Sequence, residues 1–129
     1  VLAVDEAHVL LGEKNILGAE FLAQVQRRAR KYNTGTIIIT QQPSDFVGEG
    51  MLTHGKAIFD NASYYLVMGL KKQAAEDLAQ LIDLNDNEKE SIKRYSQGQG
   101  LFVCGNRRMQ INVVVSEKEL ESFGSGGGY

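Results

Sequence analysis

Short apolar runs alternate with stretches of helical periodicity along this chain. Val1–Val4 and Thr36–Thr40 are continuous apolar or β-branched runs, which predicts strands buried on both faces. Between them, an apolar residue recurs every fourth position from about Ile16 to Tyr32, which is typical of an amphipathic helix. Tyr64–Met68 predicts a third strand. The first half of the chain is therefore expected to alternate strand and helix.

The remaining pattern predicts further helices and a hairpin. Asn85 with Glu88, and Ser116 with Glu119, have the spacing of capping boxes at helix starts. The expected elements are helices at about Met51–Asp60, Gln73–Ile82, Asn87–Tyr95 and Ser116–Phe123, and strands at Leu101–Cys104 and Met109–Val115 joined by a turn at Gly105–Arg108. This order indicates an α/β fold with a mostly parallel sheet, helical crossovers and an antiparallel C-terminal hairpin.

Composition is that of an ordinary globular domain. Of the 129 residues, 43% are hydrophobic and 23% charged, and the net charge of −2 provides no global attraction for nucleic acid or an anionic membrane. Cys104 is the only cysteine, which excludes a disulfide framework and favours a reducing, cytosolic compartment. No apolar run approaches the roughly 20 residues that cross a bilayer. Because the chain begins at Val1 within an apolar run, we expect a piece of a longer protein.

Two carboxylates follow the first apolar run. Four apolar residues and then Asp5-Glu6 form the Walker B pattern of nucleotide hydrolases. One carboxylate in that place can hold Mg²⁺, directly or through water, and the next can orient and deprotonate an attacking water. An acidic pair at a solvated loop start has the same appearance, so this pattern alone does not assign a function. His8 follows in the loop, where an ordinary polar role suffices.

A glutamine and a basic cluster accompany the second strand. Gln41 follows Ile37–Ile39 at the edge where open α/β sheets bind ligands, and its amide can hydrogen-bond a γ-phosphate and a hydrolytic water. Arg30, at the end of the preceding helix, points away from its own subunit's nucleotide and can reach a neighbouring subunit as an arginine finger. Without a nucleotide site, Gln41 is a loop residue and Arg27–Lys31 is a helix end whose charges match the helix dipole.

A string resembling a phosphate loop occurs before the third strand. Gly50 and Gly55-Lys56 have the right spacing, but Ala57 stands where a Ser or Thr hydroxyl must bind Mg²⁺, and no buried strand precedes the string. We expect this string to be unrelated to phosphate binding, which leaves the sequence without a Walker A loop.

Two other functions are compatible with parts of the pattern. A non-enzymatic α/β interaction module could use Arg27–Lys31 to bind nucleic acid or a partner protein, and its contacts to phosphates would weaken steeply with salt. A nuclease could hold a metal ion on Asp5, Glu6 and Asp45, and it would cleave DNA without ATP. Both account for fewer of the motifs than a motor ATPase does.

Taken together, the motifs resemble those of the conjugation and type IV secretion ATPases, in the FtsK–HerA branch of RecA-like P-loop motors. The resemblance rests on Val1–His8, Arg30–Gly35 and Thr36–Asp45, and it continues through Ala57–Ala62 and Gly98–Leu101 to the final strand and helix. Within that family the sequence is most similar to the pilus-biogenesis ATPase of the VirB/TraC/TrbE type, and the DNA-translocating coupling protein is the alternative. Residues 1–123 would then be the C-terminal part of a RecA-like ATPase domain, from Walker B onward, with a flexible glycine-rich tail at residues 124–129.

The resemblance also implies roles for individual residues. Asp5 would serve Mg²⁺ through water, and Glu6 would be the catalytic base. Gln41 would sense the nucleotide, and Arg30 would be the finger supplied to the neighbouring subunit. The family's Walker A lysine has no counterpart here, so the isolated chain is expected to lack ATPase activity.

The same resemblance implies cofactors and partners. The cofactors would be ATP and Mg²⁺. The partners would be further copies in a hexamer or smaller assembly, other type IV secretion components at the cytoplasmic face of the inner membrane, and DNA. Such an assembly energises pilus or channel assembly and the transfer of DNA or protein.

Overall fold

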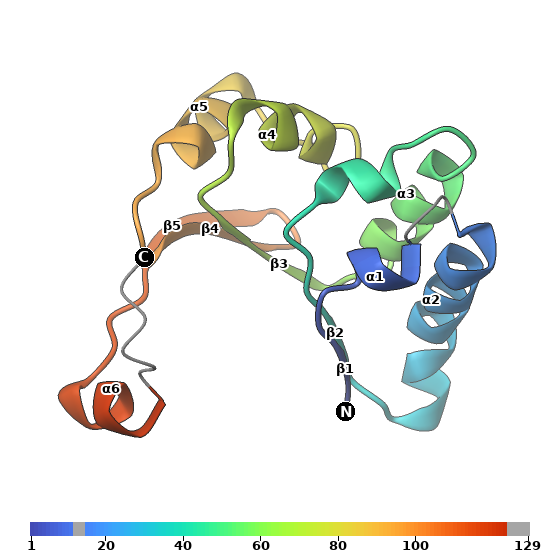
Figure 1. Cartoon of the computed structure of the whole chain (residues 1–129), viewed down its shortest axis with the longest axis horizontal. Coiled ribbons are helices and arrows are strands. Elements are labelled where there is room, and N and C mark those ends of the chain that lie inside the picture. The colour runs from blue at the N-terminus through green and yellow to red at the C-terminus, as the bar shows by residue number, and fades with distance from the viewer. Residues whose placement is uncertain (12–14, 124–129) are drawn as a thin grey trace.

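The computed structural model describes residues 1–11 and 15–123 and shows a mixed α/β arrangement (Figure 1). The elements are β1 (Leu2–Val4), α1 (His8–Leu11), α2 (Ile16–Ala29), a 3₁₀ turn (Arg30–Tyr32), β2 (Thr36–Ile38), a second 3₁₀ turn (Pro43–Phe46), α3 (Leu52–Asp60), β3 (Tyr64–Met68), α4 (Lys72–Leu78), α5 (Asp86–Arg94), β4 (Gln99–Cys104), β5 (Arg107–Asn112) and α6 (Glu117–Phe123). The predicted α/β class is confirmed. The side chain of Arg30 and the predicted tail at residues 124–129 lie outside the described part of the chain.

The strands form two ladders. β1 and β2 pair in parallel, with Ala3 opposite Ile37, and α2 lies in the crossover between them. β3, β4 and β5 pair antiparallel in that order. The parallel crossover and the C-terminal hairpin are confirmed, but the prediction of a mostly parallel sheet is wrong for the described residues. After β3 the chain forms α4 and α5 and comes back to the end at which β3 finished, so β4 runs antiparallel to β3.

A hydrophobic core joins the helices to one face of each ladder. In the antiparallel ladder the strand alternation turns Val67, Leu101 and Val103 inward, and Figure 1 shows α4 and α5 lying over this ladder. The most deeply buried large side chains come from α1, α2, the second 3₁₀ turn, the residue before α3, and α5: Leu11, Leu22, Phe46, Met51 and Ile92.

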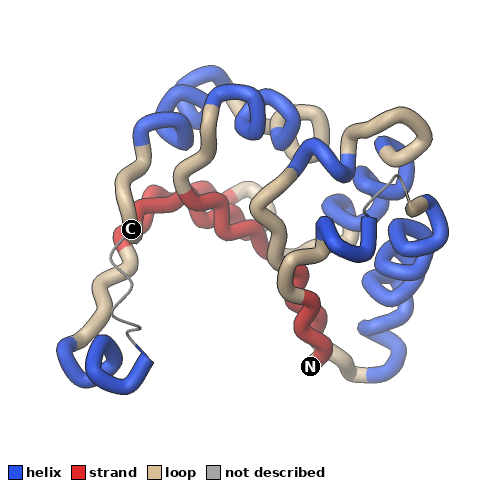
Figure 2. The backbone as a smooth tube through the Cα atoms, in the orientation of Figure 1, coloured by secondary structure: helices blue, strands red, loops and turns tan. Residues whose placement is uncertain are grey.

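The opposite face of both ladders is open. Ile37 and Ile39 are 52% and 48% exposed, and Leu66 of β3 is 54% exposed. Figure 2 shows the strands as a curved band with the main group of helices along one side. The prediction that Val1–Val4 and Thr36–Thr40 are buried on both faces is therefore wrong for this chain. Their composition suits a doubly covered strand, but burial requires a second layer, and the described residues place none there.

Close packing between α3 and the second 3₁₀ turn depends on Gly55. A Cβ at this position would lie 3.1 Å from the carbonyl carbon of Phe46 and closer still to its oxygen. The backbone of the turn that follows β2 therefore rests directly on α3, and this contact sets how the loop after β2 is held.

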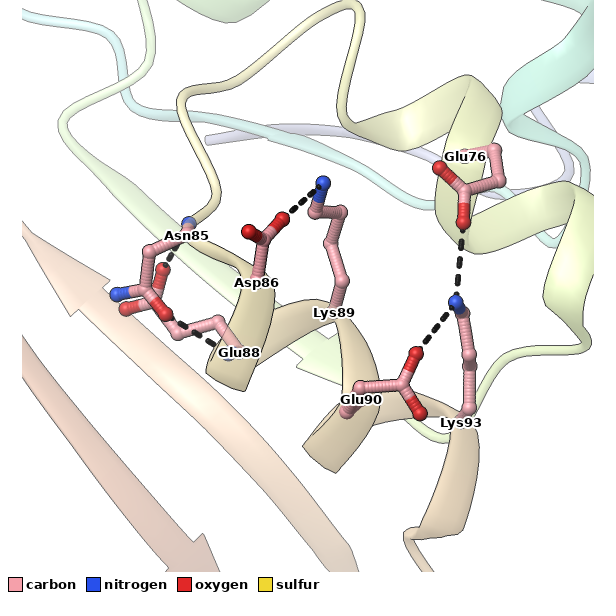
Figure 3. A network of polar contacts seen from close by, with 7 residues as sticks. All are labelled: Glu76, Asn85, Asp86, Glu88, Lys89, Glu90 and Lys93. Carbon is pink, nitrogen blue, oxygen red and sulfur yellow. Dashed lines mark hydrogen bonds and ion pairs between the residues drawn. The ribbon is translucent and has the colours of Figure 1, made fainter.

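Polar contacts fix α5 against α4. Lys93 Nζ lies 3.0 Å from Glu76 of α4 and 2.9 Å from Glu90 of α5, as Figure 3 shows. Lys93 lowers the pKa of both carboxyls, first through its hydrogen bond and second through its positive charge. The predicted capping box is confirmed, because Glu88 N–H donates to Asn85 Oδ1 and Asn85 N–H donates to Glu88 Oε2, both at 2.9 Å.

The last strand is shorter than predicted. The expected strand Met109–Val115 stops at Asn112, because its partner β4 begins at Gln99, directly opposite Asn112. One further bond, from Val113 N–H to Gly98 O at 2.7 Å, ends the pairing. α6 follows and stands apart from the other helices in Figure 1.

The start of α6 has the capping box expected from the sequence. Ser116 N–H donates to Glu119 Oε2 at 2.9 Å, and Glu119 N–H donates to Ser116 Oγ at 3.3 Å. Within residues 1–11 and 15–123, no helix is both long enough and apolar enough to cross a lipid bilayer.

Candidate functional site

The acidic pair lies in the turn where β1 ends. Asp5 and Glu6 are both exposed, and Asp5 Oδ1 accepts a hydrogen bond from Glu6 N–H at 2.9 Å. Glu6 has a φ of 48°, in the left-handed region that residues with a side chain rarely adopt. Such a conformation costs on the order of 1 kcal/mol or more and persists only where the surrounding structure fixes it. The backbone at Glu6 is therefore held in an unfavourable conformation at a strand end.

Backbone hydrogen bonds fix this turn to the end of β2. Ile39 N–H donates to Val4 O at 2.9 Å, and Ala7 N–H donates back to Ile39 O, also at 2.9 Å. Ala7 is fully buried, so the second bond is shielded from water. Since β1 and β2 are parallel, the segments that follow them leave the ladder at the same edge. The structure thus places the turn of Asp5 and Glu6 beside the loop that carries Gln41, as the motif order predicted.

The loop after β2 is anchored on both sides of Gln41. Thr40 Oγ1 accepts a hydrogen bond from Gln42 N–H at 3.1 Å, and Pro43 is buried at the start of the 3₁₀ turn. Gln41 itself is exposed. Its backbone is therefore held while its side chain is available to a ligand at the same edge as Glu6.

The basic cluster lies at the other end of the β1–β2 ladder. Arg30 opens the 3₁₀ turn that follows α2, and this turn leads to Gly35, whose carbonyl accepts a hydrogen bond from Leu2 N–H at 2.8 Å. The turn therefore adjoins the start of β1, whereas Glu6 follows its end. The structure does not bring the backbone of Arg30 to the acidic pair of its own chain. This separation agrees with a role toward a neighbouring subunit, which stays a prediction.

The site required for a nuclease is not formed. Within residues 1–11 and 15–123, no group of three or more His, Cys, Asp or Glu side chains is arranged to hold a metal ion. Asp5, Glu6 and Asp45 therefore do not form such a group among the described residues.

The second half of the phosphate-loop-like string lies in a packed helix. Gly55 and Lys56 lie inside α3, and Gly55 faces the backbone of Phe46. A phosphate loop needs free backbone N–H groups that point at an anion, whereas an N–H inside a helix is already bonded. Gly55 N–H is bonded to Met51 O at 2.8 Å, so it does not point at an anion.

Sequence reasoning missed three residues near the site. Ala7 and Thr40 provide the hydrogen bonds that hold the two loops, and no sequence signal distinguishes them from ordinary small residues. His8 was expected to have an ordinary polar role in the loop. Instead its Nδ1 is buried at the start of α1 and has no hydrogen-bond partner among the described residues.

The edge suits Mg²⁺ better than it suits a whole triphosphate. Mg²⁺ usually keeps several waters and takes one or two carboxylates together with phosphate oxygens, which fits the exposed carboxylate of Asp5. A triphosphate also requires a cradle of backbone N–H groups and a lysine. Within the described residues the Gly50–Lys56 string was the candidate for that cradle, but its Gly55 is packed against Phe46 and Gly55 N–H is bonded to Met51 O.

Known proteins share this fold and sequence pattern. The solved structure of VirB4 from Thermoanaerobacter pseudethanolicus matches 92% of the chain with a TM-score of 0.84 and 31% sequence identity. An uncharacterized protein of Bacillus anthracis is 22% identical over 130 residues, covering 95% of the chain. The chain spans 32% of the VirB4 chain and 20% of the Bacillus anthracis protein. No family model matches the chain.

The agreement in both fold and sequence supports the class of type IV secretion ATPases. Within that class, it resembles the C-terminal region of a VirB4-type ATPase. The resemblance that the motifs indicated is therefore confirmed.

Proposed function

We propose that this chain supplies the water-activating edge of an ATP-hydrolysing motor that energises a type IV secretion apparatus. The observation that carries the proposal is the Ala7–Ile39 hydrogen bond, which holds the turn of Asp5 and Glu6 beside the loop of Gln41. The likeness to VirB4 supports the family of the motor and favours this role over that of a coupling protein.

Each residue at this edge has a role that its chemistry allows. Asp5 would hold a water of the Mg²⁺ shell, and Glu6 would accept the proton of the attacking water. The Gln41 amide would donate to a γ-phosphate oxygen and accept from the attacking water. When bound, Mg-ATP supplies the phosphoryl group and neutralises its developing charge. The backbone bonds hold both loops side by side before a ligand binds, which reduces the reorganisation that binding requires.

The other parts of the ATP-hydrolysing site lie outside this edge of the sheet. A Walker A loop elsewhere in a longer ATPase holds the phosphates, and Arg30 of a neighbouring copy completes the site. We place the assembly, a hexamer or a smaller oligomer, at the cytoplasmic face of the cell membrane beside other secretion components. DNA or protein is the transported substrate.

The test is a Glu6→Gln substitution in a full-length ATPase that contains this sequence. The amide keeps the shape of the side chain but cannot take the proton, so hydrolysis should fall by about 10²–10⁴-fold while ATP binding is retained. Glu20→Gln, on the exposed surface of α2, is the matched control and should hydrolyse ATP at the normal rate. Hydrolysis by Glu6→Gln above about a tenth of the normal rate would rule out Glu6 as the base.

A further inference from the structure

β5 has a free edge on the side that faces away from β4. It is the last strand of the antiparallel ladder, and within residues 1–11 and 15–123 it pairs with β4 alone. The bond from Val113 N–H to Gly98 O fixes which residues of β5 are hydrogen-bonded to β4, because these alternate along an antiparallel pair. The residues between them, Arg108, Gln110 and Asn112, therefore direct their backbone N–H and C=O groups away from the ladder.

The side chains of the same three residues lie on the face of the ladder that α5 covers. Gln110 stands opposite Leu101, which faces the core, so the alternation of the strand puts Arg108 and Asn112 on the helix side as well. Arg108 Nη1 lies 2.9 Å from Glu88 Oε2 in the first turn of α5. α5 and the free edge are thus neighbours, as Figure 1 also shows for α5 and β5.

A groove of about 410 Å³ lies between the last turn of α5 and β5. Its polar lining residues are Ser91 and Arg94 of α5, Gln99 of β4, and Gln110 and Asn112 of β5. Gln99 Oε1 accepts a hydrogen bond from Ser96 N–H at 2.9 Å, and the NH₂ of the same amide has no partner among the described residues. The groove therefore offers side-chain hydrogen-bond donors directly beside an unpaired strand edge.

Arg94 provides an accessible positive charge at this groove. Its side chain is 81% exposed, and its ion pair with Glu90 has an N–O distance of 3.8 Å, which is longer than a direct hydrogen bond. Glu90 also pairs with Lys93 at 2.9 Å. Arg107, exposed at the start of β5, adds a second positive charge. An acidic ligand would find counter-ions here, whereas the β5 edge of a second copy would bring further arginines.

We propose that an extended, acidic segment of a partner protein adds to the free edge of β5 as a fourth strand of this ladder. Its backbone exchanges hydrogen bonds with Arg108, Gln110 and Asn112. Every second side chain of the segment then lies on the helix side, beside Arg94, and carboxylates suit that place. The side chains between them lie next to Met109, which is 47% exposed on the opposite face, and apolar groups suit that place.

The edge itself favours a peptide over nucleic acid. It alternates N–H and C=O groups, which matches the backbone of another strand, whereas its carbonyl oxygens repel phosphates. The contact involves neither nucleotide nor the turn that follows β1. It therefore goes beyond the proposed ATPase function and does not depend on it.

A model peptide tests the contact on the whole chain. The probe is an acetylated and amidated octapeptide of alternating glutamate and valine, titrated into the isotope-labelled protein and followed by nuclear magnetic resonance. Saturable shifts are expected for the amides of Arg108, Gln110 and Asn112, whose hydrogen exchange should slow by at least about tenfold at saturation. Raised salt should weaken binding. The same peptide N-methylated along its pairing edge should not bind, because it cannot donate to the strand.

Two substitutions separate the backbone contribution from that of charge. Gln110→Pro removes an outward N–H, which an edge strand tolerates, so the circular dichroism should be retained and peptide binding lost. Arg94→Glu should weaken the glutamate peptide by about fivefold or more and should favour a peptide of alternating lysine and valine. Arg28→Glu, on the exposed surface of α2, is the matched control and should leave both affinities unchanged.

Unshifted amides at Arg108, Gln110 and Asn112 would overturn the proposal, and so would equal binding of the N-methylated peptide. Equal effects of Arg94→Glu and Arg28→Glu would do the same even if Gln110→Pro failed to fold. An oligothymidine that shifts these amides at a lower concentration than the peptide would assign the edge to nucleic acid instead. Concentration-dependent protection of the amides without peptide would assign it to a second copy, and either outcome would refute the acidic strand.

Discussion

Replacing Gly55 by alanine tests how closely α3 packs on the turn that follows the Gln41 loop. A methyl group at this position would lie 3.0 Å from Phe46 Cβ and 3.1 Å from its carbonyl carbon, and nearer still to the carbonyl oxygen. The opposing atoms include backbone and are not the flexible end of a side chain, so they cannot move aside alone. Either α3 or the Pro43–Phe46 turn must shift.

Two opposing effects set the magnitude. In an exposed helix, glycine to alanine stabilises by about 1 kcal/mol, because alanine restricts the unfolded chain and suits the helix. Overpacking a tight contact costs about 1–3 kcal/mol, and a clash with backbone belongs at the upper end of that range. We therefore expect Gly55→Ala to be destabilised by about 1–2 kcal/mol, which for a chain of this size lowers Tm by about 4–8 °C.

The assay is urea denaturation and thermal melting followed by circular dichroism. Gly48→Ala is the matched control, since the nearest heavy atoms to its added methyl, Met51 Cγ and Ser44 O, are both 4.0 Å away. Gly48→Ala should match the parent or exceed it by up to about 1 kcal/mol. If Gly55→Ala were as stable as Gly48→Ala, the close approach of α3 to Phe46 would be refuted.

Two further predictions concern ligand binding and pH. In titration calorimetry the isolated chain should show no micromolar affinity for Mg-ATP, because it lacks a phosphate loop and presents carboxylates to an anion; micromolar binding would return the Gly50–Lys56 string to consideration. Lys93 lowers the pKa of Glu76 and Glu90 in the folded state. The ion pairs of these two carboxylates therefore stabilise the fold fully above the unfolded pKa of about 4.5, and this stabilisation is lost as the pH falls through the lower pKa values of the folded state. The urea midpoint should therefore fall less between pH 6 and pH 3 in Lys93→Met than in the parent or in the exposed-site control Lys118→Met, and equal slopes in all three would count against this linkage.

Local rules explain which elements were predictable. The capping box of Asn85 and Glu88 involves residues three apart, so the sequence contains everything that forms it. The parallel pairing of β1 and β2 follows from two apolar runs joined by a helical segment, because parallel strands need such a crossover connection. The same rule puts the turn of Glu6 and the loop of Gln41 at one edge, and so this half of the candidate site was predictable from motif order alone.

What the tertiary structure decided depends on neighbours that are distant in sequence. The exposure of Ile37 and Ile39 reflects which face of the sheet the helices cover, and a β-branched run looks the same whether one face is covered or two. The hydrogen bond from Ala7 to Ile39 joins residues 32 positions apart in the chain, and the left-handed backbone of Glu6 lies in the turn that this bond holds. The sequence by itself therefore determined the chemistry of this edge and the order of its elements. Only the folded chain decided how that chemistry is held and which surfaces remain uncovered, because burial and backbone strain are properties of contacts rather than of residues.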